Sequence, residues 1–328
     1  MKQSCYGILL KMKKNDYMKK NSCSPMARDL RRYLPLCFLV MVLHGSCQKE
    51  ETVLPDNGTA ELEILTRLVE NTSRNAIMGN SLPDGTSIGV VMVDEDEEDY
   101  QGLGYNNVRY TASSEDGSQK WNATNGVTLS GESATLYAYH PWKDNVDIEK
   151  ITVDLSESQD DWMYATPVTG LSNTNSTALI EMKHALANMR ISLVKGDFAG
   201  NGKVSKISLT SQGIASQATL NGKTGELSAI QQQGTALDCG ANATISDEPV
   251  ELNVLFVPTE TEDTPIKVDI TVDDKVYTIT SPEVTTEAGT SINFTLIQNS
   301  VMLVMDKVTV TPWTEALNET LEVDKKKD

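Results

Sequence analysis

The chain has 328 residues, 39% of them hydrophobic, and a formal net charge of −18. Its first 46 positions hold nine Lys and Arg but only two Asp and Glu, so the remainder carries 19 basic and 44 acidic side chains, a net of −25. Such a surface repels polyanions, which excludes nucleic acid and argues against anionic lipid headgroups as partners. The remaining length is sufficient for two domains of ordinary size.

The N-terminal region has the pattern of an export signal. An apolar run over residues 34–43 follows a cluster of arginines and is too short to cross a bilayer as a helix. The small pair Gly45-Ser46 precedes Cys47, which suits a lipoprotein signal peptidase. We therefore predict that residues 1–46 are a leader and signal peptide and that Cys47 is lipidated. The alternative is an ordinary signal peptide with an incidental cysteine.

Removal of the leader and lipidation of Cys47 would leave too few cysteines for an intramolecular disulfide. Only Cys47 and Cys239 remain. With Cys47 lipidated, no intramolecular disulfide is available in the oxidising compartment. We predict that Cys239 is a small buried hydrophobic residue, with a reactive thiol as the alternative.

Beyond a linker at residues 47–59, apolar residues recur with period two between clusters of Gly, Asn, Asp, Ser and Thr. The clearest runs are 62–64, 88–93, 136–139, 151–155, 191–193, 204–209, 250–257, 266–272, 276–279 and 308–310. The pattern predicts an all-β protein with two antiparallel β-sandwich domains, residues 60–183 and 184–328. The boundary falls near Met182–Asn188. It lies within Glu181–Arg190, which favours either a short helix or a strand that crosses between the domains.

Catalytic chemistry is scarce in this sequence. Only His140 and His184 remain after the leader, and neither belongs to a zinc or catalytic motif, so we predict packing roles for both. The acidic run Asp94–Asp99 lacks the spacing of a calcium loop and favours a solvated loop. We predict no enzyme activity, no metal and no cofactor.

A set of short segments resembles the fimbrillin family, the subunits of type V pili from Gram-negative anaerobes. These segments are the lipobox at Cys47, the strand Ala60–Leu65, the segments Leu82–Val90, Leu136–Trp142 and Lys183–Ala187, and the run Val308–Trp313. The resemblance implies transthyretin-like sandwiches and a lipidated precursor at the surface of the outer membrane. It also implies cleavage by an arginine-specific protease, and strand exchange with other pilin subunits in a fimbria. A tip subunit would further touch a host surface ligand.

The resemblance directs attention to two segments of this chain. We predict cleavage between Arg74 and Asn75, in a polar stretch, with Arg67 as second choice because it lies inside a strand pattern. Simple exposed charges are the alternative for both arginines.

The predicted donor strand is 314–324, in which Leu317, Leu321 and Val323 share one face. The alternative is that this stretch is an edge strand of its own domain or a frayed tail. The upstream strand Val301–Val310 is predicted to belong to the core.

A second function remains open. A surface-anchored β-sandwich lipoprotein could bind glycans through exposed tryptophans that stack on sugar rings. The candidates are Trp121, Trp142, Trp162 and Trp313. The alternative, and the more common role of tryptophans near strand ends, is that they are core or corner residues.

Overall fold

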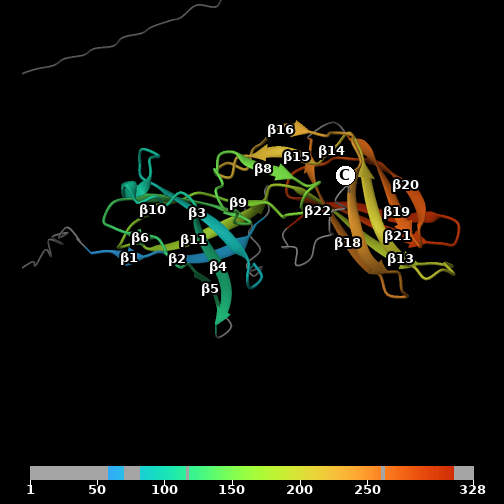
Figure 1. The fold of residues 1–328 in the computed structure, drawn as a ribbon, viewed down its shortest axis with the longest axis horizontal. Coiled ribbons are helices and arrows are strands. Elements are labelled where there is room, and N and C mark those ends of the chain that lie inside the picture. Colours follow the sequence, from blue (N-terminus) through green and yellow to red (C-terminus); the bar gives the residue numbers. More distant parts are fainter. Residues whose placement is uncertain (1–57, 70–81, 116–117, 260–262, 314–328) are drawn as a thin grey trace, which may run out of the picture. The chain divides into compact units, whose positions relative to one another are not determined.

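The computed structural model describes residues 58–69, 82–115, 118–259 and 263–313 (Figure 1). These residues form strands β1 to β22 and one 3-10 turn, η1 (Tyr100–Gly102), without an α-helix. The prediction of an all-β fold is confirmed. The segment Glu181–Arg190 is not a helix, because it contains the end of β11 and the start of β12.

The first half of the described chain forms an eight-stranded sheet in the order β2-β11-β9-β7-β3-β4-β5, with β10 added beside β7. Its strands are β2 (Glu63–Leu68), β3 (Ser87–Val93), β4 (Val108–Glu115), β5 (Ser118–Asn122), β7 (Ala134–His140), β9 (Met163–Ala165), β10 (Val168–Leu171) and β11 (Thr177–His184). A separate antiparallel pair joins β1 (Ala60–Glu61) to β6 (Thr128–Leu129).

Three further sheets form in the rest of the chain. One has the order β14-β18-β12-β21-β22, one β17-β13-β19-β20, and one β16-β15-β8. Their strands are β8 (Ile151–Asp154), β12 (Ala187–Lys195), β13 (Lys203–Thr210), β14 (Ile214–Ala215), β15 (Gln217–Leu220), β16 (Leu227–Gln231), β17 (Leu237–Thr244), β18 (Val250–Pro258), β19 (Thr264–Val272), β20 (Lys275–Val284), β21 (Thr290–Gln298) and β22 (Leu303–Pro312).

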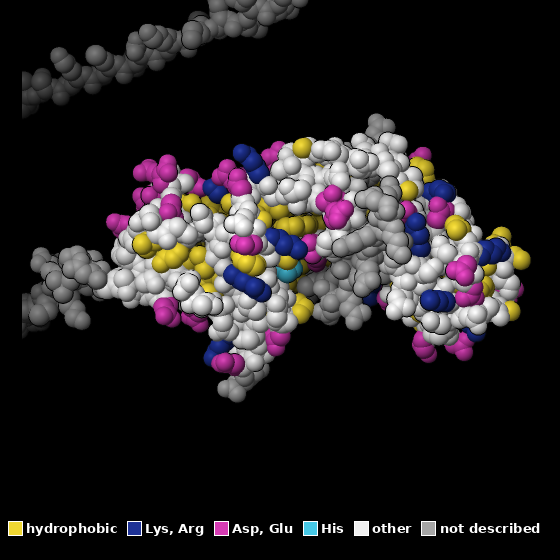
Figure 2. All heavy atoms as spheres, viewed as in Figure 1, with side chains coloured by type: hydrophobic (Ala, Val, Ile, Leu, Met, Phe, Trp, Pro, Cys, Tyr) yellow, Lys and Arg dark blue, Asp and Glu magenta, His cyan; other side chains and the backbone are white. Residues whose placement is uncertain are grey.

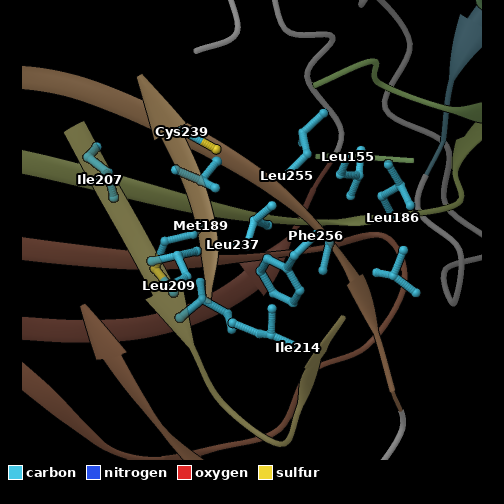
Figure 3. Packing of buried hydrophobic residues seen from close by; sticks show 14 of the residues in the cluster. Leu155, Leu186, Met189, Ile207, Leu209, Ile214, Leu237, Cys239, Leu255 and Phe256 are labelled. Atoms are coloured by element: carbon cyan, nitrogen blue, oxygen red, sulfur yellow. The ribbon is translucent and has the colours of Figure 1, made fainter. Parts of the chain in front are cut away.

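The period-two apolar residues point into two hydrophobic clusters. One cluster is built from the eight-stranded sheet and the strands beside it. The other gathers the later strands together with β8, and Figure 3 shows part of it. Cys239 is fully buried in this second cluster, so the prediction of a small buried hydrophobic residue is confirmed. Burial of apolar surface stabilises each cluster by roughly 25 cal/mol for each Å² removed from water.

The sheets are not purely antiparallel, which corrects one part of the prediction. β2 runs parallel to β11, and β12 runs parallel to β21. Period-two patterning fixes which side chains face inward but not the direction of a neighbouring strand. Parallel neighbours need a long connection, and here the other strands of the same half provide it.

β22 fits the prediction of a core strand only in part. Leu303 is 6% exposed and belongs to the second cluster, against which Met305 and Val308 pack. β22 lies at the edge of its sheet, and Val301 before it and Val310 within it are 78% and 46% exposed. Asp306 is an extra residue in its pairing with β21, between Met305 and Lys307. A bulge and a charge at an edge strand hinder pairing with another chain.

Candidate functional site: the N-terminal edge strand

β2 occupies the edge of the eight-stranded sheet and pairs in parallel with β11 (Figure 1). Four apolar side chains of the segment 60–69 point inward and are almost fully buried. These are Leu62, Ile64, Leu68 and Val69, with exposures of 7%, 3%, 1% and 4%. We call the place along β11 that this segment fills the β2 position. The strand is therefore part of the core although it lies at a sheet edge.

Backbone hydrogen bonds hold this segment along its length. The Leu62 N–H donates to Val127 O at 3.0 Å, and the Val69 N–H donates to Met182 O at 3.0 Å. The Glu63 N–H donates to Ser176 O at 2.9 Å. All these contacts are noncovalent, so only the chain after Val69 links the segment covalently to the sheet that it completes.

Thr66 is the polar exception among the inward positions of β2. Its hydroxyl donates to Gln119 Oε1 at 2.8 Å and accepts from Trp121 Nε1 at 3.2 Å. Gln119 and Trp121 both belong to β5, and we call this pair the polar notch. A strand in the β2 position must therefore place a polar group here, since an indole N–H buried without a partner is costly.

The outer face of β2 is matched to β11 residue by residue. Leu65 lies opposite Leu179, and both are exposed, at 43% and 45%. One step further along, Arg67 forms an ion pair with Glu181. Arg67 is thus a paired residue inside β2, where backbone pairing protects it from a protease.

The remaining predicted site residues lie outside the described residues. They are Cys47, Arg74, Asn75, Leu317, Leu321 and Val323.

Trp313 is the last described residue before the C-terminal segment. Its ring stacks on His184 with centroids 3.5 Å apart and planes 10° apart, and both residues are buried. His184 Nδ1 lies 2.8 Å from the Asp161 carboxylate, and the Trp313 N–H donates to Gly289 O. These contacts fix the point where the last 15 residues begin. The sequence could not reveal this cluster, because Asp161 and Trp313 are far apart in the chain.

His140 also lies in packed surroundings, with Nδ1 at 2.8 Å from Ser87 O. Burial lowers the pKa of His140 below its usual value near 6.5, although the bond to Ser87 and the charges of Asp161 and Asp160 oppose this effect. The packing roles expected for both histidines agree with these contacts.

The lowered pKa of His140 predicts a loss of stability in acid. Below about pH 6.5 the unfolded chain takes up a proton at this site more readily than the folded chain, so stability falls as the pH drops through that value. We expect His140→Gln to have a smaller drop in the free energy of unfolding between pH 7.5 and 5.5 than the wild type, measured by urea denaturation. An equal drop in both proteins would contradict this.

The structure removes most of the basis for sugar stacking. Trp121, Trp162 and Trp313 are 9%, 5% and 4% exposed, so these three rings are core residues and are not available to stack on a sugar. Trp142 is half-buried, and the Arg109 guanidinium lies 4.8 Å from its ring centroid.

The described residues show no basic patch on the face seen in Figure 2. Figure 2 shows acidic and basic groups interspersed over the face it displays. Within the described residues, no three His, Cys, Asp or Glu side chains are placed to bind a metal ion together. The part of the chain covered by the structure also lacks a helix with the length and apolar character needed to cross a membrane.

The comparisons with known proteins agree with this architecture. The family model described as "Fimbrillin-like" matches residues 66–313. The chain therefore belongs to the fimbrillin-like family.

Among the solved structures that match the chain, two illustrate the shared fold. One is a "putative cell adhesion protein" from Bacteroides uniformis, 18% identical, with a TM-score of 0.60 over 80% of this chain and 100% of that chain. The other carries the same description and comes from Bacteroides ovatus, 18% identical, with a TM-score of 0.56 over 78% and 98%. No curated protein sequence matches the chain.

Proposed function

We propose that this chain is a structural subunit of a cell-surface fimbria, exported as a lipoprotein to the outer membrane and assembled by β-strand exchange. The observation that carries the proposal is the β2 position, where an edge segment supplies buried core residues through noncovalent contacts alone. Its partners are other pilin subunits and an arginine-specific protease, and a tip subunit would also contact a host surface ligand.

A cut after Arg74 would free the whole segment 60–69. That segment would remain attached to the lipid at Cys47, while the rest of the subunit could leave it. Each large apolar side chain removed from the core contributes about 1.5–3 kcal/mol of burial. The outer edge of β11 would also lose its backbone partners, so the opened subunit strongly favours a replacement strand.

The local structure favours Arg74 over Arg67 as the cleavage site. A protease must bind several residues on each side of the scissile bond in an accessible, unpaired backbone. Arg67 is held in β2, and the next residue, Leu68, is 1% exposed. Arg74 lies in a stretch that is polar in sequence, between Val69 and Leu82.

The replacement strand would come from the C-terminal residues 314–324 of another subunit. Leu317, Leu321 and Val323 recur at alternating positions, which suits an extended strand with one apolar face. Trp313 fixes the start of this segment through its stacking on His184. The position of the donor relative to its own subunit would then be the same in every copy.

Treatment of the purified precursor with an arginine-specific protease tests the proposal. We expect a new N-terminus at Asn75 and a ladder of oligomers on electrophoresis. Arg74→Gln should abolish both, whereas Arg109→Gln, which changes an exposed arginine of β4, should change neither. Cleavage at Asn75 without oligomers, or oligomers formed by uncut Arg74→Gln, would refute strand exchange.

A further inference from the structure

We propose that the strand replacing β2 runs antiparallel to β11 in a single register, in which Glu319 of a second copy enters the polar notch. This inference rests on the proposed function and adds to it the direction and register of the incoming strand. It follows from comparing what the β2 position requires with what the C-terminal sequence can supply.

The β2 position has four successive inward sites, which the segment 60–69 fills with Leu62, Ile64, Thr66 and Leu68. The first, second and fourth of these residues are 7%, 3% and 1% exposed and belong to the hydrophobic cluster. The third is half-buried and faces Gln119 and Trp121. The order required of an incoming strand is therefore apolar, apolar, polar, apolar.

The C-terminal segment offers one face that fits this order. Its odd-numbered residues from 315 to 325 read Glu, Leu, Glu, Leu, Val, Lys, and its even-numbered residues from 316 to 324 read Ala, Asn, Thr, Glu, Asp. The even face has no large apolar side chain and cannot fill the core. The odd face contains three large apolar residues, interrupted by Glu319.

Only an antiparallel placement of the odd-numbered residues gives the required order of apolar and polar side chains. Placed antiparallel to β11, the odd face puts Val323, Leu321, Glu319 and Leu317 in the sites of Leu62, Ile64, Thr66 and Leu68, in that order. A shift of two residues either way puts a charged side chain in at least one of the three apolar sites.

Each parallel placement of the same residues also puts a charged side chain in an apolar site. If Leu317 takes the site of Leu62, Glu319 enters the site of Ile64, which is 3% exposed. If Leu317 takes the site of Ile64, Glu315 enters the site of Leu62. Burial of a carboxylate without hydrogen-bond donors costs several kcal/mol at least, so these frames are strongly disfavoured.

The polar notch has the chemistry that a carboxylate needs. The Trp121 Nε1–H already donates into this site, to the hydroxyl of Thr66. Rotation of the Gln119 amide would turn its NH₂ group towards the same point, where its oxygen now accepts from Thr66. This rotation gives up the hydrogen bond that Gln119 Nε2 now donates to Leu82 O, so the bond to the carboxylate has to replace it. Two donors to one carboxylate give charge-assisted hydrogen bonds, which are stronger than those of a neutral hydroxyl.

The outer face of β11 agrees with the antiparallel register. Glu181 loses its partner Arg67 when β2 leaves, and Asn318 would take the place of Arg67. The Asn318 amide can donate to the Glu181 carboxylate without introducing a like charge. β11 already pairs antiparallel with β9 on its other side, so it would then have antiparallel neighbours on both edges.

Disulfide trapping between subunits distinguishes the two directions. Thr177 of β11 is exposed and lies opposite Glu63. The antiparallel register puts Glu322 opposite Thr177, whereas the parallel frame with Leu317 in the site of Leu62 puts Asn318 there. Directly opposed strand residues have Cα atoms about 4.5–5.5 Å apart, within the range that a disulfide spans.

The experiment compares Thr177→Cys/Glu322→Cys with Thr177→Cys/Asn318→Cys in the full chain after cleavage at Arg74 and mild oxidation. Cleavage removes the four cysteines before residue 48, and Cys239 is buried. We expect at least a ~10-fold larger fraction of disulfide-linked oligomers for the first variant, by non-reducing electrophoresis.

A larger or equal fraction for the second variant would overturn the antiparallel register, as would polymers in which neither pair links. Failure of the cleaved wild-type protein to polymerise would instead refute the proposed function. The two failures are therefore separable.

Discussion

Replacement of Ile64 by alanine is expected to weaken the uncut precursor and leave the assembled fimbria unchanged. Ile64 is 3% exposed and packs in the core from β2, so truncation should lower the free energy of unfolding of the precursor by about 2–5 kcal/mol. In the polymer that we propose, the segment carrying Ile64 has left the subunit. Its side chain therefore has no contact left to lose.

A matched change on the neighbouring strand provides the control. Ile180 of β11 is fully buried in the same cluster but stays in the subunit after cleavage. Ile180→Ala should lower the stability of precursor and polymer alike, measured by urea denaturation of each form. If Ile64→Ala weakens the polymer as much as Ile180→Ala does, β2 has not been removed and the strand-exchange model fails.

Several features of the fold follow from local chemistry and could be predicted. The alternating run Leu62–Ile64 predicts a strand with its apolar side chains inward, and both residues are buried in the structure. Arg67 falls within the same alternation, and the structure places it in β2. Cys239 has a small side chain of apolar character, so burial was the simplest expectation for it.

Other features depend on contacts between distant parts of the chain. Thr66 meets Gln119 and Trp121 across 53 and 55 residues, and neither short range patterning nor composition relates them. The direction of β2 against β11 is set by the path of the intervening chain, which period-two alternation does not encode. The polar notch, which gives our proposal its register, was therefore visible only in the structure.

The tryptophans show the same limit for single residues. A tryptophan near a strand end can stack on a ligand or fill a corner of the core, because its large apolar ring suits both. Trp313 fills such a corner, stacked on His184, and Trp121 closes the notch under Thr66. Their neighbours in space decide between the two roles, and those neighbours come from other strands.

Replacement of Gln159 by leucine is expected to lower the stability of both the precursor and the polymer. Gln159 is 3% exposed, and its side-chain amide makes the two hydrogen bonds to Leu255 of β18 that the backbone of a neighbouring strand would make. Its Oε1 accepts from the Leu255 N–H at 2.6 Å, and its Nε2 donates to Leu255 O at 3.2 Å. β14 covers the same edge of β18 only at Val257 and Pro258, so none of the described strands pairs with Leu255 on this side.

Gln159→Leu keeps a similar volume but leaves the N–H and C=O of Leu255 buried without partners. Each such group costs about 1–3 kcal/mol, so we expect a loss of about 2–6 kcal/mol in the free energy of unfolding. Gln231→Leu, at an exposed glutamine of β16, should change it by less than about 0.5 kcal/mol. Equal stability of the two variants would mean that water reaches Leu255 when Gln159 is absent. Gln159 lies in the segment that joins β8 to β9, whereas Leu255 belongs to the second cluster. A large loss of stability in Gln159→Leu would therefore show that this side chain holds the joining segment against the later sheets.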